Sequence, residues 1–392
     1  MKTTPTLQSV NNFLLEKQHL IPQPGVESIA RIVQDVVGLH ATVATTPYLS
    51  LFARRANFEK EQLDEALYDR STLAKLRCVR TTIYVHTRTN LPTVYAATAA
   101  LIRDASRKYM HRRGIDEKVF EELSHAVLEL LVDEDRSAAE IRRALDSGID
   151  TSALLYHMCD LGLLLRRRPL RSWRDRSFHY GRFDQHYPDV DLHSLAEEVA
   201  LVELVRQYLA GFGPALEEDV YWWFGLPKAK VRRALYALEG ETEEVEIDGL
   251  EGAHIILSDQ REPLERYEKD RREVVNFLPM LDSYLMGYQV RRRCLDPRHT
   301  EHVFDRSGNA TSTIMLDGKI IGVWDFEHRN PPCMKLYFFE KMPSGLREKV
   351  GAHASCMGAF IAGDDADIRF CASMVPLPQR TAGGFMRPLK DS

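Results

Sequence analysis

Two stretches of the chain repeat one order of predicted elements, and this repeat constrains the fold more than any other feature. Residues 117–183 are predicted as a helix, a short helix, a third helix and then two strands that return on each other. Ser137 precedes the short helix with Glu140 three residues later, which is the pattern of a capping box. Residues 194–257 repeat the order, with Gly225 separating the second helix from the third. Three short helices followed by a β-hairpin form the winged-helix arrangement, a relative of the helix-turn-helix.

Apolar periodicity and turn residues locate the individual elements. The predicted helices are residues 8–18, 27–40, 44–56, 60–69, 151–161, 217–224, 228–238 and 346–361. The predicted strands are residues 78–86, 163–169, 176–180, 245–247, 254–257, 311–316, 319–326 and 335–339, with turns at Asp248-Gly249 and Asp317-Gly318. The sequence therefore predicts a mainly helical α+β protein with three winged-helix units in tandem and a C-terminal β-rich domain. We expect these domains to span residues 1–115, 116–190, 191–270 and 271–392.

Composition excludes several classes of protein. Hydrophobic residues make up 44% and charged residues 28% of the 392 residues, as in soluble globular proteins. No apolar run is long enough to span a bilayer, and the N-terminus lacks the apolar stretch of a signal peptide. The six cysteines include no Cys-x-x-Cys pair, and His353 and Cys356 lack a second pair of metal ligands. We expect a cytoplasmic protein with reduced thiols, no metal, no cofactor and no membrane contact.

Basic residues gather in short stretches although the net charge is −5. Between residues 166 and 182 only Asp175 opposes seven arginines, and Trp173, Phe178 and Tyr180 are interleaved with them. The local field, rather than the net charge, decides where a polyanion docks. A solvated surface is the alternative for any one stretch. We predict that double-stranded DNA is the partner and that its phosphates contact Arg166, Arg167, Arg168, Arg171, Arg174, Arg176, Arg182, Arg291 and Arg292.

A pattern of apolar residues at helical spacing ends at the stretch Gly38-Leu39-His40-Ala41-Thr42. If this stretch is extended, the side chains of His40 and Thr42 point the same way and address one small target. A histidine that titrates near neutral pH beside a hydroxyl group is suited to orienting a water molecule. The alternative is structural, with His40 capping its own helix and Thr42 capping the next.

Several segments, taken in order, resemble one family of proteins. They are residues 38–51, 79–84, 212–215, 222–226, 278–288 and 303–309. In combination they are similar to the winged-helix DNA glycosylases of the AlkZ and YcaQ type, and the resemblance covers nearly the whole chain. It implies tandem winged helices bent into a C shape around duplex DNA, with a C-terminal β-rich domain. It also implies monofunctional hydrolysis of the N-glycosidic bond of a damaged, bulky-alkylated, cross-linked or otherwise modified base, which leaves an abasic site.

The two polar residues of the motif differ from those of the family. Family members carry Gln-x-Gln or Gln-x-Asp where this chain has His40-Ala41-Thr42. By analogy, His40 and Thr42 take the family role of positioning a water and stabilising charge at the sugar. We expect altered activity rather than its loss.

The reaction passes through an oxocarbenium-like sugar, so a nearby anion and an oriented water are useful. Asp282 is the candidate carboxylate, and a turn or helix cap is its structural alternative. His40 could accept a proton from water, or as an imidazolium could protonate the leaving base. We expect Arg80 and Thr82, on a strand near the motif, to line the pocket with Tyr48, although a surface ion pair is an equal alternative for Arg80. Trp222 and Trp223 are expected in the core, with base stacking as the less favoured role.

Two rival functions remain, a transcription regulator and a catalytically inactive DNA-binding relative. The third helix of the middle unit, residues 151–161, contains no Arg, Lys, Asn or Gln to read base edges. Its arginines lie in the wing instead, which favours gripping of the DNA backbone without sequence readout. This pattern suits a monomeric protein that searches for lesions better than it suits an operator binder.

Overall fold

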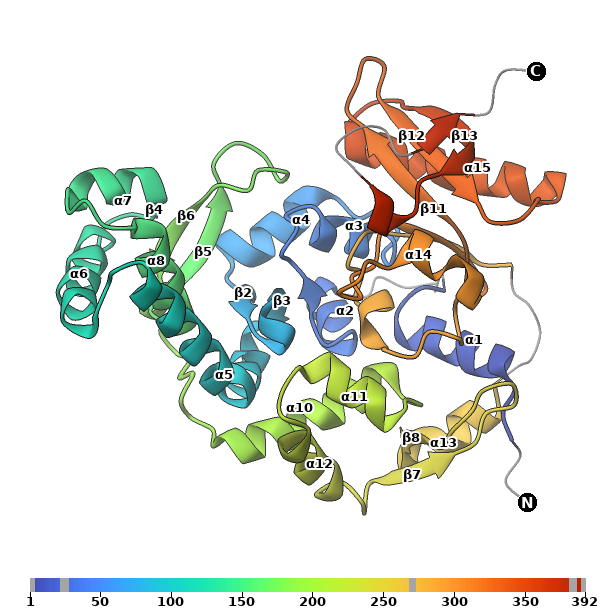
Figure 1. The fold of residues 1–392 in the computed structure, drawn as a ribbon, viewed down its shortest axis with the longest axis horizontal. Coiled ribbons are helices and arrows are strands. Elements are labelled where there is room, and N and C mark those ends of the chain that lie inside the picture. The colour runs from blue at the N-terminus through green and yellow to red at the C-terminus, as the bar shows by residue number, and fades with distance from the viewer. Residues whose placement is uncertain (1–3, 22–27, 268–272, 381–385, 389–392) are drawn as a thin grey trace.

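The computed structural model describes residues 4–21, 28–267, 273–380 and 386–388 (Figure 1). It is a mixed α/β protein. Within the described residues there are four β-sheets, of three, six, three and two strands. None of the helices in these ranges is long and apolar enough to cross a lipid bilayer.

The N-terminal unit surrounds a three-stranded antiparallel sheet of order β1-β3-β2. Its elements are α1 (Leu7–Lys17), α2 (Ile29–Asp35), β1 (Leu39–His40), α3 (Thr46–Phe52), α4 (Lys60–Asp64), a π-helical turn (Glu65–Asp69), β2 (Leu73–Arg77), a 3₁₀ turn (Val79–Thr81), β3 (Ile83–Thr87) and α5 (Leu91–Arg112).

Two predictions for this unit are wrong, and one helix was missed. The helix expected at 27–40 ends at Asp35 in the part that the structure describes, because the chain turns at Gly38 and enters β1. The strand expected at 78–86 is instead the turn of a hairpin followed by β3, and β2 precedes it. The long helix α5 was not predicted, although Pro92 in its first turn is a helix-start signal.

The second unit follows the predicted order of elements. It consists of α6 (Glu117–Leu130), β4 (Arg136–Ser137), α7 (Ala138–Leu145), α8 (Thr151–Asp160), β5 (Leu164–Pro169), β6 (Phe178–Arg182) and α9 (Phe183–His186), with the sheet order β4-β6-β5. The predicted capping box is confirmed, because Ser137 Oγ accepts from the N–H of Glu140 and the Glu140 carboxylate accepts from the N–H of Ser137. In Figure 1 this unit lies at the left, at the opposite side from the C-terminal sheet.

The third unit runs along the lower edge of Figure 1. It consists of α10 (Glu197–Phe212), α11 (Glu217–Phe224), α12 (Lys228–Tyr236), β7 (Thr242–Val245), β8 (His254–Leu257) and α13 (Ser258–Glu265). The predicted helix at 217–224 is confirmed, and Gly225 ends it with φ +63°. The predicted tight turn at Asp248-Gly249 is present, because the N–H of Leu250 donates to the carbonyl of Ile247 over 3.0 Å and Gly249 has φ +88°. It does not join β7 to β8 directly, since residues 246–253 form a longer loop between them. Asp248 exchanges backbone hydrogen bonds with Pro5 and Leu7, so this loop reaches across to the N-terminal segment.

The C-terminal part is built on a six-stranded sheet of order β14-β13-β12-β11-β10-β9, in which only β12 and β13 are parallel. Its elements are β9 (Val275–Leu278), α14 (Thr300–Val303), β10 (Thr313–Leu316), β11 (Lys319–Glu327), β12 (Cys333–Phe338), α15 (Ser344–Ala362), β13 (Asp367–Met374) and β14 (Met386–Pro388). The predicted β10–β11 turn is confirmed, because Asp317 and Gly318 both have the positive φ that a type I′ turn requires.

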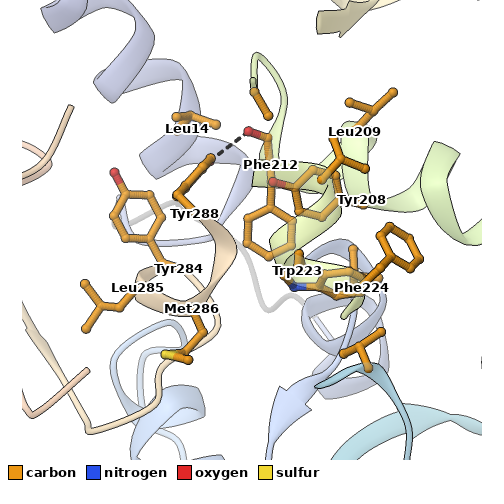
Figure 2. Packing of buried hydrophobic residues seen from close by; sticks show 14 of the residues in the cluster. Leu14, Tyr208, Leu209, Phe212, Trp223, Phe224, Tyr284, Leu285, Met286 and Tyr288 are labelled. Carbon is orange, nitrogen blue, oxygen red and sulfur yellow. Dashed lines mark hydrogen bonds between the residues drawn. The ribbon is translucent and has the colours of Figure 1, made fainter. Parts of the chain in front are cut away.

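An aromatic cluster joins the third unit to the segment that follows β9. Figure 2 shows Tyr288 facing the side chains of α10 and α11, among them Tyr208 and Phe212, with Tyr284 packed behind Tyr288. The Tyr288 hydroxyl donates to the carbonyl of Phe212 over 2.7 Å, and the Tyr208 hydroxyl donates to the carbonyl of Gly287 over 2.8 Å. Buried tyrosines with satisfied hydroxyl groups fix both position and orientation. The cluster therefore holds residues 282–288 rigidly beside the N-terminal sheet.

Candidate active site

The chain enters the His40 motif through a turn that requires glycine. Gly38 has φ +97°, and a Cβ atom there would lie 2.5 Å from Cε1 of His86. The carbonyl of Gly38 accepts a hydrogen bond from Ser283 Oγ over 2.7 Å. From this turn β1 pairs antiparallel with β3, so that His40 lies opposite Tyr84. The motif is thus anchored from two sides, by β3 and by the segment after β9.

His40 is a buried and neutral histidine. Its side chain packs on Tyr84, with 4.9 Å between ring centroids, and the residue is 2% exposed. Burial, and secondarily the positive charge of Arg80, lower the pKa of His40 to about 4. The N–H of Thr42 donates to Nδ1 over 3.4 Å, which leaves the ring proton on Nε2. Because His40 lies in a strand, its alternative role as a cap of the preceding helix is wrong.

Thr42 is the exposed member of the motif. Its Oγ1 accepts from the N–H of Ile83 over 3.3 Å, so the hydroxyl proton remains available to a bound molecule. The N–H of Ala41 donates to the carbonyl of Ile83 over 2.7 Å and continues the pairing beyond β1. Nε2 of His40 has no hydrogen-bond partner among the described residues. Two neighbouring side chains therefore offer an N–H and an O–H donor, which can orient a water or a sugar oxygen without transferring a full charge.

Sequence analysis placed Arg80 and Thr82 on a strand, and this prediction is wrong. Both residues lie in the turn that joins β2 to β3. Arg80 and Thr81 have φ values of 51° and 56°, a left-handed conformation that is uncommon for residues with a side chain. Thr82 Oγ1 donates to the carbonyl of Val79 over 3.1 Å and closes the turn. A Cβ atom at Gly225 would lie 3.1 Å from Cα of Arg80, so the end of α11 packs directly on this turn.

Tyr48 is held away from solvent on α3. Its hydroxyl donates to Oδ1 of Asp64 over 2.5 Å, and its ring lies 5.2 Å from that of Trp173. Burial, the neighbouring Tyr68 and the Asp64 carboxylate all raise the pKa of Tyr48. Tyr48 therefore contacts α4 and the β5–β6 loop.

Asp282 has no exposed surface and is surrounded by donors. Arg54 binds it with both terminal nitrogens, over 2.7 and 2.8 Å. Ser50 Oγ donates to it over 2.6 Å and the N–H of Tyr284 over 3.0 Å. The bond from the N–H of Tyr284 closes a local turn, which is the structural role that sequence analysis gave as the alternative for Asp282. In this arrangement the carboxylate joins α3 to the 282–288 segment and faces protein on every side.

Sequence analysis did not single out the polar residues of α3 and of the turn just after it that hold this arrangement. Thr46, Ser50 and Arg54 follow one another at a spacing of four and so share one face. Thr46 Oγ1 donates to the carbonyl of Met280 over 3.0 Å, one turn before the Ser50 and Arg54 contacts. A polar stripe on the otherwise apolar stretch 46–54 was the signal that could have identified them.

Most of the arginines in the 166–182 stretch are bound within the protein. Arg167 is buried and donates to the carbonyls of Leu67 and Tyr68 over 2.8 and 2.6 Å. Arg174 donates to the carbonyl of Ile361 on α15, next to Trp173, which packs against Phe360. The remaining contacts are Arg166 on the Tyr156 ring, Arg168 with Asp69, and Arg182 with Asp184.

The exposed basic residues form a smaller set than predicted. Arg168, Arg171 and Arg176 have exposed side chains in the wing, and Arg171 is 3.6 Å from Asp175. Arg292 is also exposed, 3.7 Å from Glu251. Arg291 is half-buried and donates to the carbonyl of Gly308 over 2.8 Å. No group of three or more His, Cys, Asp or Glu side chains in the described ranges is suited to hold a metal ion.

Comparisons with known proteins identify the family. The profile of the family described as "DNA glycosylase AlkZ-like" matches residues 33–360. The chain belongs to the AlkZ-like DNA glycosylase family. It is 25% identical over 156 residues to an interstrand DNA cross-link repair glycosylase of Streptomyces sahachiroi, a match that spans 39% of this chain and 41% of that protein. The solved structure of the Streptomyces sahachiroi DNA glycosylase AlkZ superimposes with a TM-score of 0.75 at 18% identity, covering 94% of this chain and 100% of that one. The structural likeness establishes a shared fold.

Proposed function

We propose that this protein is a monofunctional DNA glycosylase that removes a bulky-alkylated, cross-linked or otherwise modified base from duplex DNA by hydrolysis. The observation that carries the proposal is the His40-Ala41-Thr42 motif at the end of β1, where the AlkZ-like family has its polar motif. Both of its polar side chains keep a free donor, His40 at Nε2 and Thr42 at Oγ1. The family membership and the curated cross-link repair relative support the same reaction.

The chemistry required of the motif is orientation rather than strong base catalysis. The N-glycosidic bond breaks with its electron pair leaving on the base, and water then attacks the cationic sugar carbon and releases its proton to solvent. This attack is fast once the water is held on the correct face of the sugar. A neutral His40 and the Thr42 hydroxyl can hold that water without adding a positive charge beside the cation. A protonated His40 would repel the cationic sugar. Because the pKa of His40 is lowered to about 4, the imidazole is neutral at neutral pH.

Asp282 has a positioning role in this mechanism. Its pairing with Arg54 fixes the segment whose Ser283 binds the carbonyl of Gly38, at the entrance to the motif. A negative charge neutralised by a bidentate arginine is poorly suited to stabilise a sugar cation directly. Asp282 therefore acts through the position of His40.

DNA binding in this proposal uses tandem winged helices that form a C-shaped surface around the duplex. The element order of the second and third units supports this arrangement. The exposed Arg168, Arg171 and Arg176 of the wing are the residues proposed to contact phosphates. Arg168 lies near the end of β5 and the other two lie in the loop that follows, and positions in a wing favour backbone contacts over base readout.

Excision of defined lesions tests the function. Duplexes with a bulky N-alkylated purine, an interstrand cross-link or a modified base are incubated with the protein and then cleaved with alkali at abasic sites. We expect strand scission on at least one of them. His40→Ala should slow scission by about 10²–10⁴-fold with duplex affinity unchanged within a few-fold. His353→Ala, which changes an exposed histidine of α15, is the matched control and should retain full activity.

Two outcomes would contradict the proposal. Absence of scission on every lesion, together with tight binding to one palindromic sequence, would favour a transcription regulator. Binding to lesions without scission would favour a catalytically inactive relative. If His40→Ala also abolished duplex binding, the motif would be structural.

A further inference from the structure

Two arginines from distant parts of the chain share the ring of Trp222, beside the His40 motif. Cζ of Arg80 lies 3.9 Å from the centroid of the Trp222 ring, and Cζ of Arg291 lies 5.1 Å from it. Arg291 also lies 3.6 Å from the centroid of the Phe304 ring. Aromatic faces hold guanidinium groups by cation–π attraction while their N–H groups stay free at the edges. The two charges are therefore fixed in position by rings.

A tight loop holds both guanidinium groups from one side. Arg80 Nη2 donates to the carbonyl of Ser307 over 3.3 Å, and Arg291 Nη2 donates to the carbonyl of Gly308 over 2.8 Å. The Asp305 carboxylate shapes this loop by accepting from the backbone N–H groups of Ser307 and Asn309. The acceptors of both arginines are neutral carbonyls, so these contacts leave their positive charges uncompensated.

Neither arginine has a carboxylate at ion-pair distance within the part of the chain that the structure describes. Burial lowers the pKa of Arg291 to about 10, and the charge of Arg80 contributes to that lowering. Asp305 acts on both guanidinium groups, and Asp219 on Arg291, only from beyond ion-pair distance. The two positive charges repel each other, and a directly bound anion would relieve the repulsion. Arg291 is the more enclosed of the two and already binds Gly308. Arg80 uses one N–H of its guanidinium in the described contacts and is the group available to a ligand.

The turn that carries Arg80 is connected directly to the motif. It leads into β3, whose Ile83 pairs with Ala41 and Thr42 through backbone and hydroxyl hydrogen bonds. The charge of Arg80 is close enough to lower the pKa of His40. An anion on Arg80 would thus lie next to the position where the sugar of a substrate nucleotide meets His40.

We propose that Arg80 binds the DNA phosphate adjacent to the nucleotide whose base is removed at His40, with Trp222 as its platform and Arg291 as a second, supporting charge. This inference rests on the proposed glycosylase function and specifies how the substrate nucleotide is held. Both guanidinium groups lie against the Trp222 ring, so this tryptophan acts as a support for arginine and not as a stacking partner for a base. A diester phosphate fits the free edge of a guanidinium, which donates two parallel hydrogen bonds.

The test pairs a protein variant with a single neutralised phosphate. Binding is measured for a duplex that holds a tetrahydrofuran abasic analogue, with a methylphosphonate placed in turn at each phosphate around it. Arg80→Gln should weaken binding of the unmodified backbone about 10-fold or more, which is the loss of a charge-assisted contact. At one phosphate flanking the analogue, the methylphosphonate should cause no further loss in Arg80→Gln. Arg80→Lys keeps the charge and should bind within a few-fold of the unsubstituted protein.

Arg171→Gln is the matched control, since Arg171 is an exposed arginine of the wing. Its loss of binding affinity should add to the loss caused by each methylphosphonate beside the lesion. Thermal unfolding of each variant establishes that the fold is intact. Additive effects of Arg80→Gln at all flanking phosphates, or unchanged affinity, would overturn the inference. If the coupling is found but no lesion is excised, the phosphate contact stands and the glycosylase function fails. If no duplex binds at all, both proposals fail.

Discussion

The wing and the Trp222 cluster are both rich in arginine, yet they use it in opposite ways. In the wing, Arg167 pairs with Asp135, Arg168 with Asp69 and Arg182 with Asp184, so carboxylates of the protein compensate much of the positive charge. On the Trp222 ring, Arg80 and Arg291 are the arginines that the described part of the chain places there, and they have rings and carbonyls as partners. The smaller group is therefore the stronger candidate for an anion-binding site beside the motif.

The difference shows that the number of arginines in a stretch says little about the charge available to DNA. A guanidinium that is paired with an acid contributes to the fold, and one that rests on an aromatic ring keeps its field. Sequence analysis predicted that the seven arginines of the wing contact phosphates, and it expected Arg80 only to line the pocket. The predictions below separate these two roles.

Protein stability should separate the bound arginines of the wing from its exposed arginines, and this is the largest effect that we expect. Arg167→Ala leaves the carbonyls of Leu67 and Tyr68 buried without a donor, so we expect a loss of about 2–4 kcal/mol in the free energy of unfolding. Arg176→Ala removes an exposed wing arginine and should cost less than about 0.5 kcal/mol. Urea denaturation measures both values. Equal, small losses would mean that Arg167 does not hold the wing to the N-terminal unit.

Salt dependence measures how much of the wing reaches DNA. If Arg168, Arg171 and Arg176 each neutralise a phosphate, the triple glutamine variant should lower the slope of log affinity against log salt by about three units. The slope is obtained by fluorescence anisotropy of a labelled duplex between low and physiological salt. An unchanged slope would mean that the wing does not contact DNA. It would not bear on the Arg80 contact, which is tested separately.

The pH dependence of excision should respond to Arg80 and not to the wing. Because the pKa of His40 is lowered to about 4, the single-turnover rate should be flat near neutral pH and fall only as the pH approaches that value. The charge of Arg80 contributes to this lowering, so Arg80→Gln raises the pKa of His40 and moves the acid limb to higher pH. Arg171→Gln should leave the limb in place. A limb that moves to lower pH in Arg80→Gln would contradict the electrostatic connection.

Local signals predicted the parts of the fold that depend on neighbours in sequence. Ser137 and Glu140 marked the start of α7, and Asp317-Gly318 marked the β10–β11 turn, because caps and type I′ turns are made by adjacent residues. β1 carries no such signal. Its two residues are a strand only because β3 lies beside them, and the helical pattern before Gly38 obscured the change.

The contacts that support the candidate site were not predicted. His40 lies in β1 and Thr42 in the bend that follows it, where the N–H of Thr42 donates to Nδ1 of His40. Arg54 is the distant partner of Asp282 and Trp222 that of Arg80, each more than a hundred residues away in the chain, and no spacing in the sequence reports such contacts. The pairing of Arg54 with Asp282 converts a candidate catalytic carboxylate into a candidate positioning group.

The most direct test of the account is a crystal structure of the protein bound to a duplex that contains a tetrahydrofuran abasic analogue. We predict that the sugar of the analogue lies within hydrogen-bond reach of His40 and Thr42 and that a flanking phosphate lies on Arg80. A duplex bound elsewhere on the surface, with no DNA atom near His40, would contradict the central claim that this motif is the site of chemistry.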